Sequence, residues 1–127
     1  MSLRFWMAAK AIVEVVFGIG FVAVPAYLAD LFGMDFNETG ELMARLFGTA
    51  FIFGAIVLWL AQNASHTEKA LQAIVIGVIL SNAIGFVVTL MATLADTWNA
   101  LGWLPVGLYL VFGLVFAYFL FTKPRLT

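Results

Sequence analysis

Long runs without a charged side chain constrain this sequence more than any other feature. The chain of 127 residues carries six Lys or Arg and seven Asp or Glu, and the stretches between them include 15–29, 46–67, 70–95 and 97–122. Three of these stretches exceed the roughly 20 residues with which a helix crosses the apolar core of a bilayer. The first reaches that length when it is extended backward past Glu14 and Lys10.

We therefore predict an all-α integral membrane protein, with residues 1–127 forming one domain in which four transmembrane helices make a compact bundle. Hydrophobic residues make up 65% of the chain and charged residues 10%, against about a quarter charged in soluble domains. The first span is too long for the apolar region of a signal peptide and no convincing cleavage site follows it. The predicted helices cover about 5–29, 42–61, 69–94 and 103–122.

The basic residues predict how the chain crosses the membrane. If the spans alternate, five basic residues fall on one side and Arg45 alone on the other. The five are Arg4, Lys10, Lys69, Lys123 and Arg125. Because Lys and Arg concentrate in cytoplasmic segments, we expect both termini in the cytoplasm and a multi-pass protein of the inner (plasma) membrane. The opposite surface collects acids, namely Asp30, Asp35, Glu38, Glu41 and Asp96.

The residue counts exclude several function classes. The net charge of −1 and the absence of a Lys/Arg cluster argue against a nucleic-acid partner. With no cysteine, disulfides, thiolate metal sites and cysteine nucleophiles are excluded. His66, the single histidine, falls in a predicted loop, so a bis-histidine haem or a zinc site within the membrane is not expected. We predict no metal and no cofactor, and we lean toward a protein that is not an enzyme.

Two glycine patterns suggest an internal repeat. Residues 48–54 and 107–113 each begin and end with glycine and have phenylalanine before the second glycine. The stretches that begin at Gly20 and Gly85 match more weakly. A true duplication predicts two similar hairpins in parallel repeat, with their axis along the membrane normal. Chance similarity within a restricted set of residue types is the alternative.

Small residues recur at every fourth position of the third predicted helix. In lipid, helices associate where small side chains let their backbones approach. We therefore expect this row to be a buried packing seam. Its members are Ala73, Gly77, Ser81, Gly85, Thr89 and Thr93.

Polar residues inside the predicted spans are candidates for function. Lys10 and Glu14 lie one helical turn apart, with Glu14 near mid-membrane, where an unpaired charge costs several kcal/mol. The two can form a structural i,i+4 pair while Lys10 extends toward the interface, or Glu14 can be a working proton or cation site. Asn82 lies at similar depth and can either hydrogen-bond Glu14 across helices or serve structure alone.

A second candidate site lies near the acidic rim. Arg45 could bind an anionic head group, or form a salt-bridge cluster with Asp30, Glu41 and Asp96. Tyr109 and Trp103 would then line an apolar slot between the second and fourth helices. A fixed charge, a hydroxyl and large aromatic surfaces at one depth are typical of a small-molecule pocket.

Two resemblances to known families add expectations. Residues 11–18, Ala-Ile-Val-Glu-Val-Val-Phe-Gly, resemble the first helix of the small multidrug resistance transporters, which implies that Glu14 exchanges protons for cationic substrates. The motif at 44–48, Ala-Arg-Leu-Phe-Gly, and Gly102-Trp103 before the last helix look like the DoxX-like group of small four-helix bacterial inner-membrane proteins. Some of that group are associated with quinone-linked or redox complexes.

Three functional hypotheses follow. The first is a non-enzymatic binding or accessory subunit, self-associated as a homo-oligomer or docked on a larger membrane complex. The second is a proton-coupled small-molecule transporter that uses Glu14, which requires Lys10 to be turned toward the interface. The third is a subunit that binds a quinone or another lipophilic ligand at Arg45, Tyr109 and Trp103.

Overall fold

The computed structural model describes residues 2–63 and 68–122. Over these residues the chain is helical, without strands, and four of its helices are long and apolar enough to cross a membrane. The elements are α1 (Leu3–Ala23), α2 (Pro25–Leu31), α3 (Glu38–Asn63), α4 (Glu68–Leu94), the 3-10 turn η1 (Ala100–Gly102) and α5 (Trp103–Thr122). His66, Lys123 and Arg125, which entered the sequence predictions, lie outside the described residues.

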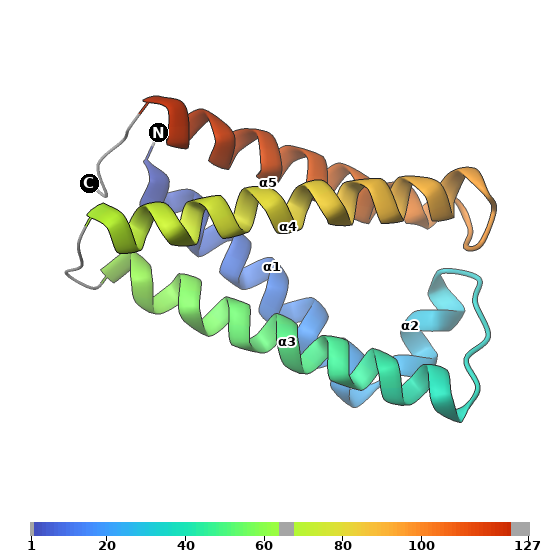
Figure 1. Ribbon diagram of the computed structural model, residues 1–127. Coiled ribbons are helices and arrows are strands. Elements are labelled where there is room, and N and C mark those ends of the chain that lie inside the picture. The colour runs from blue at the N-terminus through green and yellow to red at the C-terminus, as the bar shows by residue number, and fades with distance from the viewer. Residues whose placement is uncertain (1, 64–67, 123–127) are drawn as a thin grey trace.

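The first predicted helix, 5–29, is wrong as a single element. Proline lacks a backbone N–H and its ring crowds the preceding turn, so α1 ends at Ala23 and Pro25 begins α2. Val24 joins the two with a φ of −137° and a ψ of 57°, outside the helical region. The chain therefore turns at this point, and α2 runs across the end of the bundle (Figure 1).

The second long helix begins earlier than predicted, at Glu38 instead of 42. The Asn37 side chain accepts a hydrogen bond of 2.8 Å from the Gly40 backbone N–H, which satisfies one of the free donors at the helix start. Glu38 and Glu41 lie in the first turn, where negative charge is favoured by the helix dipole. The predicted bounds of α4 and α5 agree with the structure to within one residue.

The helices pack mainly in two pairs, α1 with α3 and α4 with α5, and α1 also contacts α5. Glycine makes the first pairing close: a Cβ added to Gly48 would lie 2.6 Å from the Gly18 carbonyl oxygen. The start of α1 and the end of α5 lie at the same end of the molecule (Figure 1). At that end α3 and α4 are near each other, and they diverge toward α2.

The apolar core fills the end of the bundle where the chain begins. Leu3 and Met7 of α1 are fully buried there, against Phe116 of α5. α3 contributes Leu58 and α4 contributes Val78. All four long helices therefore meet in one core at this end of the bundle. The opposite end lies beside α2 and has other contacts.

The small-residue row of α4 is only partly a packing seam. Ala73, Gly77 and Ser81 are exposed, and nothing lies within 4 Å of a Cβ added to Gly77. Thr89 and Thr93 are buried, and Gly85 lies against the Tyr109 ring. The buried residues nearer the start of α4 are Val75, Val78 and Asn82. Near the start of α4 the buried face is therefore not the predicted row of small residues. It is the neighbouring face, whose larger side chains belong to the core shared with α5.

The two glycine patterns occupy unlike surroundings. Gly48 contacts the backbone of α1, whereas a Cβ on Gly107 would meet nothing within 4 Å. Their second glycines are more alike, since Gly54 lies against Glu14 and Gly113 against Asn82. The chain does form two helical pairs, but the close backbone contact belongs to the first pair.

Candidate functional site

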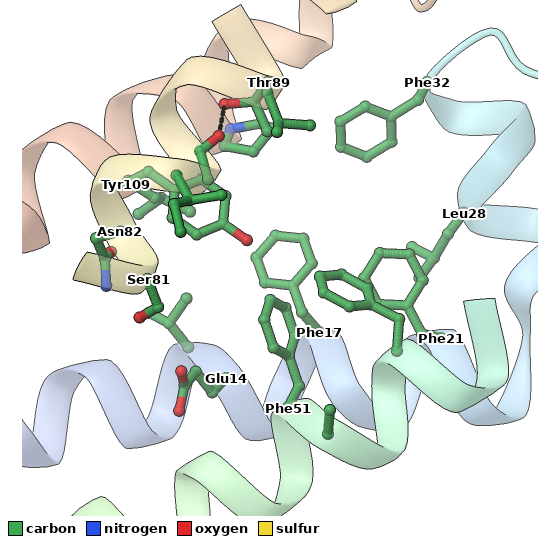
Figure 2. Close-up of a pocket in the computed structure, with 18 of the residues that line it drawn as sticks. Glu14, Phe17, Phe21, Leu28, Phe32, Phe51, Ser81, Asn82, Thr89 and Tyr109 are labelled. Atoms are coloured by element: carbon green, nitrogen blue, oxygen red, sulfur yellow. Dashed lines mark hydrogen bonds between the residues drawn. The ribbon is translucent and has the colours of Figure 1, made fainter. Parts of the chain in front are cut away.

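A pocket of about 630 Å³ lies between the two helical pairs. Residues from α1, α2, α3, α4 and α5 line it, together with the segments that follow α2 and α4 (Figure 2). Its polar lining consists of Lys10, Glu14, Ser81, Asn82, Thr89 and Tyr109. Its aromatic lining adds Phe17, Phe21, Phe32, Phe36, Phe47, Phe51, Trp98 and Phe112.

Phenylalanines of α1 and α3 form one wall. Phe17 and Phe21 are one turn apart on α1, and Phe47 and Phe51 are one turn apart on α3. The Phe21 ring lies 5.3 Å from that of Phe47 and 6.3 Å from that of Phe51, centroid to centroid. Such an aromatic surface suits an apolar molecule that stacks or packs edge to face.

Lys10 and Glu14 form a buried ion pair at one end of the pocket. Lys10 Nζ lies 3.3 Å from Glu14 Oε1, and the two side chains are 9% and 14% exposed. The same Nζ lies 5.2 Å from the centre of the Phe112 ring, a cation–π distance. The expectation that Lys10 extends toward the interface is therefore wrong: its two attractive partners both lie inside the bundle.

Gly54 of α3 makes room for the carboxylate. A Cβ at this position would lie 3.0 Å from Glu14 Oε2. Oε2 is buried and makes no hydrogen bond within the described residues. Glu14 is thus half satisfied, through Oε1, by Lys10.

Asn82 is 1% exposed and faces the pocket from α4. Its Nδ2 donates a hydrogen bond of 2.7 Å to the Val78 carbonyl one turn earlier. Its Oδ1 is buried and has no partner among the described residues. The hydrogen bond to Glu14, one of the two alternatives for Asn82, is not formed, although Figure 2 shows both residues at the same end of the pocket, together with Ser81.

Tyr109 brings a hydroxyl from α5. Its ring packs on Gly85, where a Cβ would lie 2.5 Å from the ring, so α4 and Tyr109 touch because residue 85 is glycine. Figure 2 shows the hydroxyl directed toward the phenylalanine wall. The Thr89 hydroxyl, by contrast, is occupied by a hydrogen bond of 2.7 Å to the Gly85 carbonyl.

Trp98 and Phe32 close the pocket at the α2 end. Their rings lie 5.2 Å apart, and Trp98 Nε1 donates a hydrogen bond of 2.8 Å to the Thr93 hydroxyl. The segment after α4 thereby covers the pocket from one side and α2 from the other.

The structure does not bring the predicted rim pocket together. Of its three residues only Tyr109 lines the pocket, whereas Arg45 and Trp103 are exposed and lie outside the lining. Arg45 Nη1 donates a hydrogen bond to the Val22 carbonyl, which lacks a helical donor because α1 ends at Ala23. Within the described residues Arg45 forms no ion pair with an acid, so the alternative salt-bridge cluster is also absent.

The phenylalanine wall is the part of the site that sequence reasoning missed. A signal existed, since two predicted neighbours each carry phenylalanine pairs at i,i+4 spacing. Among the described residues no group of three His, Cys, Asp or Glu could hold a metal ion. The arrangement is instead that of an apolar binding pocket with a few convergent polar groups.

Comparison with known proteins adds no identification. No protein-family model matches the chain, and no curated protein or solved structure does so either.

Proposed function

We propose that this protein is a small, non-enzymatic membrane protein that binds a lipophilic molecule in the pocket between its two helical pairs. The observation that carries the proposal is the lining: a wall of phenylalanines on one side and two buried oxygens without partners, on Glu14 and Asn82, at its polar end. Each unpartnered buried acceptor costs about 1–3 kcal/mol, which a bound molecule can recover.

Access from the bilayer supports a lipophilic ligand. Phe47 of α3 and Ile84 and Val88 of α4 line the pocket, and their side chains are 44%, 66% and 59% exposed. They lie on the two helices that diverge toward α2 (Figure 1). In a membrane this opening would face lipid, so a ligand dissolved in the bilayer would enter between α3 and α4.

The alternative function, a proton-coupled transporter that uses Glu14, is less well supported. It required Lys10 to be turned toward the interface, whereas Lys10 Nζ lies 3.3 Å from Glu14 Oε1. A quinone or another lipophilic ring compound remains a candidate ligand. It would bind in the pocket instead of at the Arg45 rim, with its ring against the phenylalanine wall.

A pair of tryptophan variants tests the proposal. Ala50 lines the pocket from α3, so Ala50→Trp should fill it. Ala83 is exposed on α4 and does not line it, so Ala83→Trp is the matched control. Each protein is purified from its native membrane in mild detergent, and native mass spectrometry measures the apolar small molecule retained per chain.

We expect wild type and Ala83→Trp to retain equal amounts of the same molecule per chain. Ala50→Trp should retain at least about tenfold less of it than wild type. Retention by none of the three proteins, or equal retention by all, would contradict the proposal. Circular dichroism of each variant checks that the helices are intact.

We further propose an orientation with both termini in the cytoplasm and the α2–α3 connection outside the inner membrane. The supporting observation is the excess of basic residues toward the termini. Because the chain has no cysteine, single cysteines report topology without background. In spheroplasts a membrane-impermeant maleimide should label Asp35→Cys and spare Ser2→Cys until the membrane is opened. The reverse labelling would overturn the orientation.

A further inference from the structure

The polar end of the pocket carries two buried hydrogen-bond acceptors that no donor among the described residues satisfies. Asn82 Oδ1 and Glu14 Oε2 are buried acceptors without partners in the described part of the chain. The Asn82 amide cannot simply be turned over, because Nδ2 donates to the Val78 carbonyl and a flip would set two oxygens against each other. Oδ1 is therefore the atom that Asn82 offers to a ligand.

The hydroxyl donors that α4 places near these oxygens are already used. The Ser81 hydroxyl donates to the Val78 carbonyl at 3.1 Å, and the Thr89 hydroxyl donates to the Gly85 carbonyl. Lys10 Nζ is paired with Glu14 Oε1, and its remaining N–H donors can serve the oxygen of a ligand. Tyr109 makes no hydrogen bond among the described residues, so its hydroxyl can donate to a ligand or accept from it.

The charge balance of the site favours a neutral ligand. A cation placed at Glu14 Oε2 would approach Lys10 Nζ, which already neutralises that carboxylate. An anion would face Glu14 itself. A neutral hydroxyl can donate its proton to Asn82 Oδ1, and its oxygen can accept from a donor such as the Tyr109 hydroxyl.

Resting on the proposed function, we infer that the pocket selects neutral amphipathic molecules whose head group is a hydroxyl. The hydroxyl donates to Asn82 Oδ1 and accepts from Tyr109, and the apolar body lies along the phenylalanine wall. An ether or a ketone of the same shape cannot donate to Oδ1, so it leaves the buried acceptor without a partner.

Two matched probes test this inference, 4-octylphenol and its methyl ether, 4-octylanisole. They differ in the O–H proton while the ring and chain are the same. Binding of each to the purified full-length protein is measured in one detergent by native mass spectrometry or titration calorimetry. We expect wild type to bind the phenol at least about tenfold more tightly than the ether, the ratio typical of one buried hydrogen bond.

Variants separate the hydrogen bond from partitioning into the micelle. Asn82→Leu removes Oδ1 and should bring the phenol-to-ether ratio close to one. Tyr109→Phe removes a donor from which the oxygens of phenol and ether both accept, so it should lower both affinities about fivefold and leave their ratio unchanged. Asn82→Ala replaces Asn82→Leu if that variant does not fold. Tyr118→Phe removes an exposed hydroxyl of the same helix outside the pocket lining and should leave the ratio unchanged.

The outcomes distinguish the two proposals. Equal binding of phenol and ether by wild type overturns the hydroxyl preference, as would occur if water satisfied Oδ1, and leaves the binding pocket standing. An undiminished ratio in Asn82→Leu, or in Asn82→Ala where Asn82→Leu does not fold, also overturns it. Failure of both probes to bind wild type counts against the proposed function itself.

Discussion

The backbone N–H of Asn99 donates a hydrogen bond of 2.7 Å to the carbonyl of Phe32. The Asn99 side chain adds a second bond of 2.9 Å, from Nδ2 to the Leu31 carbonyl, and its Oδ1 accepts from Leu101 N–H. This one residue joins the end of α2 to the turn before α5. It thus ties the two helical pairs together across the closed end of the pocket.

Asn99→Ala should loosen this connection. The variant loses the bond to Leu31 and the cap of η1, at an expected cost of about 1–2 kcal/mol in the free energy of unfolding. Thermal unfolding in detergent, followed by circular dichroism, measures the effect. Thr97→Ala is the control, because Thr97 is exposed in the same turn and its side chain makes no hydrogen bond among the described residues. Equal stability of the two variants would contradict this role of Asn99.

The matched glycines Gly48 and Gly107 should respond oppositely to alanine. At Gly48 the new Cβ would lie 2.6 Å from a carbonyl oxygen of α1, so the helices must separate, at an expected cost of about 1–3 kcal/mol. At Gly107 the Cβ meets nothing within 4 Å, and the better helix propensity of alanine should stabilise by up to about 1 kcal/mol. Unfolding titrations with sodium dodecyl sulfate compare the two. A destabilised Gly107→Ala would show that α5 has a partner at this face.

The ion pair of Lys10 and Glu14 predicts strong coupling in a double-mutant cycle. Lys10→Met leaves a buried carboxylate without its partner and should cost about 3–5 kcal/mol. Lys10→Met combined with Glu14→Gln should cost less than Lys10→Met alone, because the uncompensated charge is removed with its partner. Unfolding of wild type, Lys10→Met, Glu14→Gln and the double variant in the same detergent gives the coupling energy. Additive effects would mean that the 3.3 Å pair contributes nothing measurable.

Asp96 offers a route to a more stable protein. It follows the end of α4 with a φ of 57°, a conformation that costs a residue with a side chain about 1–2 kcal/mol. The side chain is exposed, so Asp96→Gly should raise stability by about 1 kcal/mol without other loss. Gly33, two residues after the end of α2, has a φ of 74° that glycine adopts without strain, so Gly33→Ala should lower the thermal midpoint. A midpoint lowered by Asp96→Gly would show that the carboxylate has an unrecognised stabilising role.

Local features of the sequence were enough to predict the long helices and one half of the site. The gaps between charged residues located the four long apolar helices, and i,i+4 spacing gave the pairing of Lys10 with Glu14 as one of two alternatives, a pair that the structure contains. Pro25 carried the signal for the break after Ala23, but the need for a long first span outweighed it. Asn82 was recognised as a polar residue in the middle of a helix, but its hydrogen-bond partner was not predicted.

Tertiary structure alone decided which faces of the helices point inward. In a soluble bundle an apolar stripe marks the buried face, but here α4 and α5 are apolar on all sides, and lipid accepts the same side chains as the core does. The sequence therefore could not separate Tyr109, inside the pocket, from Trp103, which is exposed, nor assign Arg45 to the Val22 carbonyl. Those positions follow from the close contact of Gly48 with α1 and from the turn at Val24, which set where the two helical pairs meet and where they part.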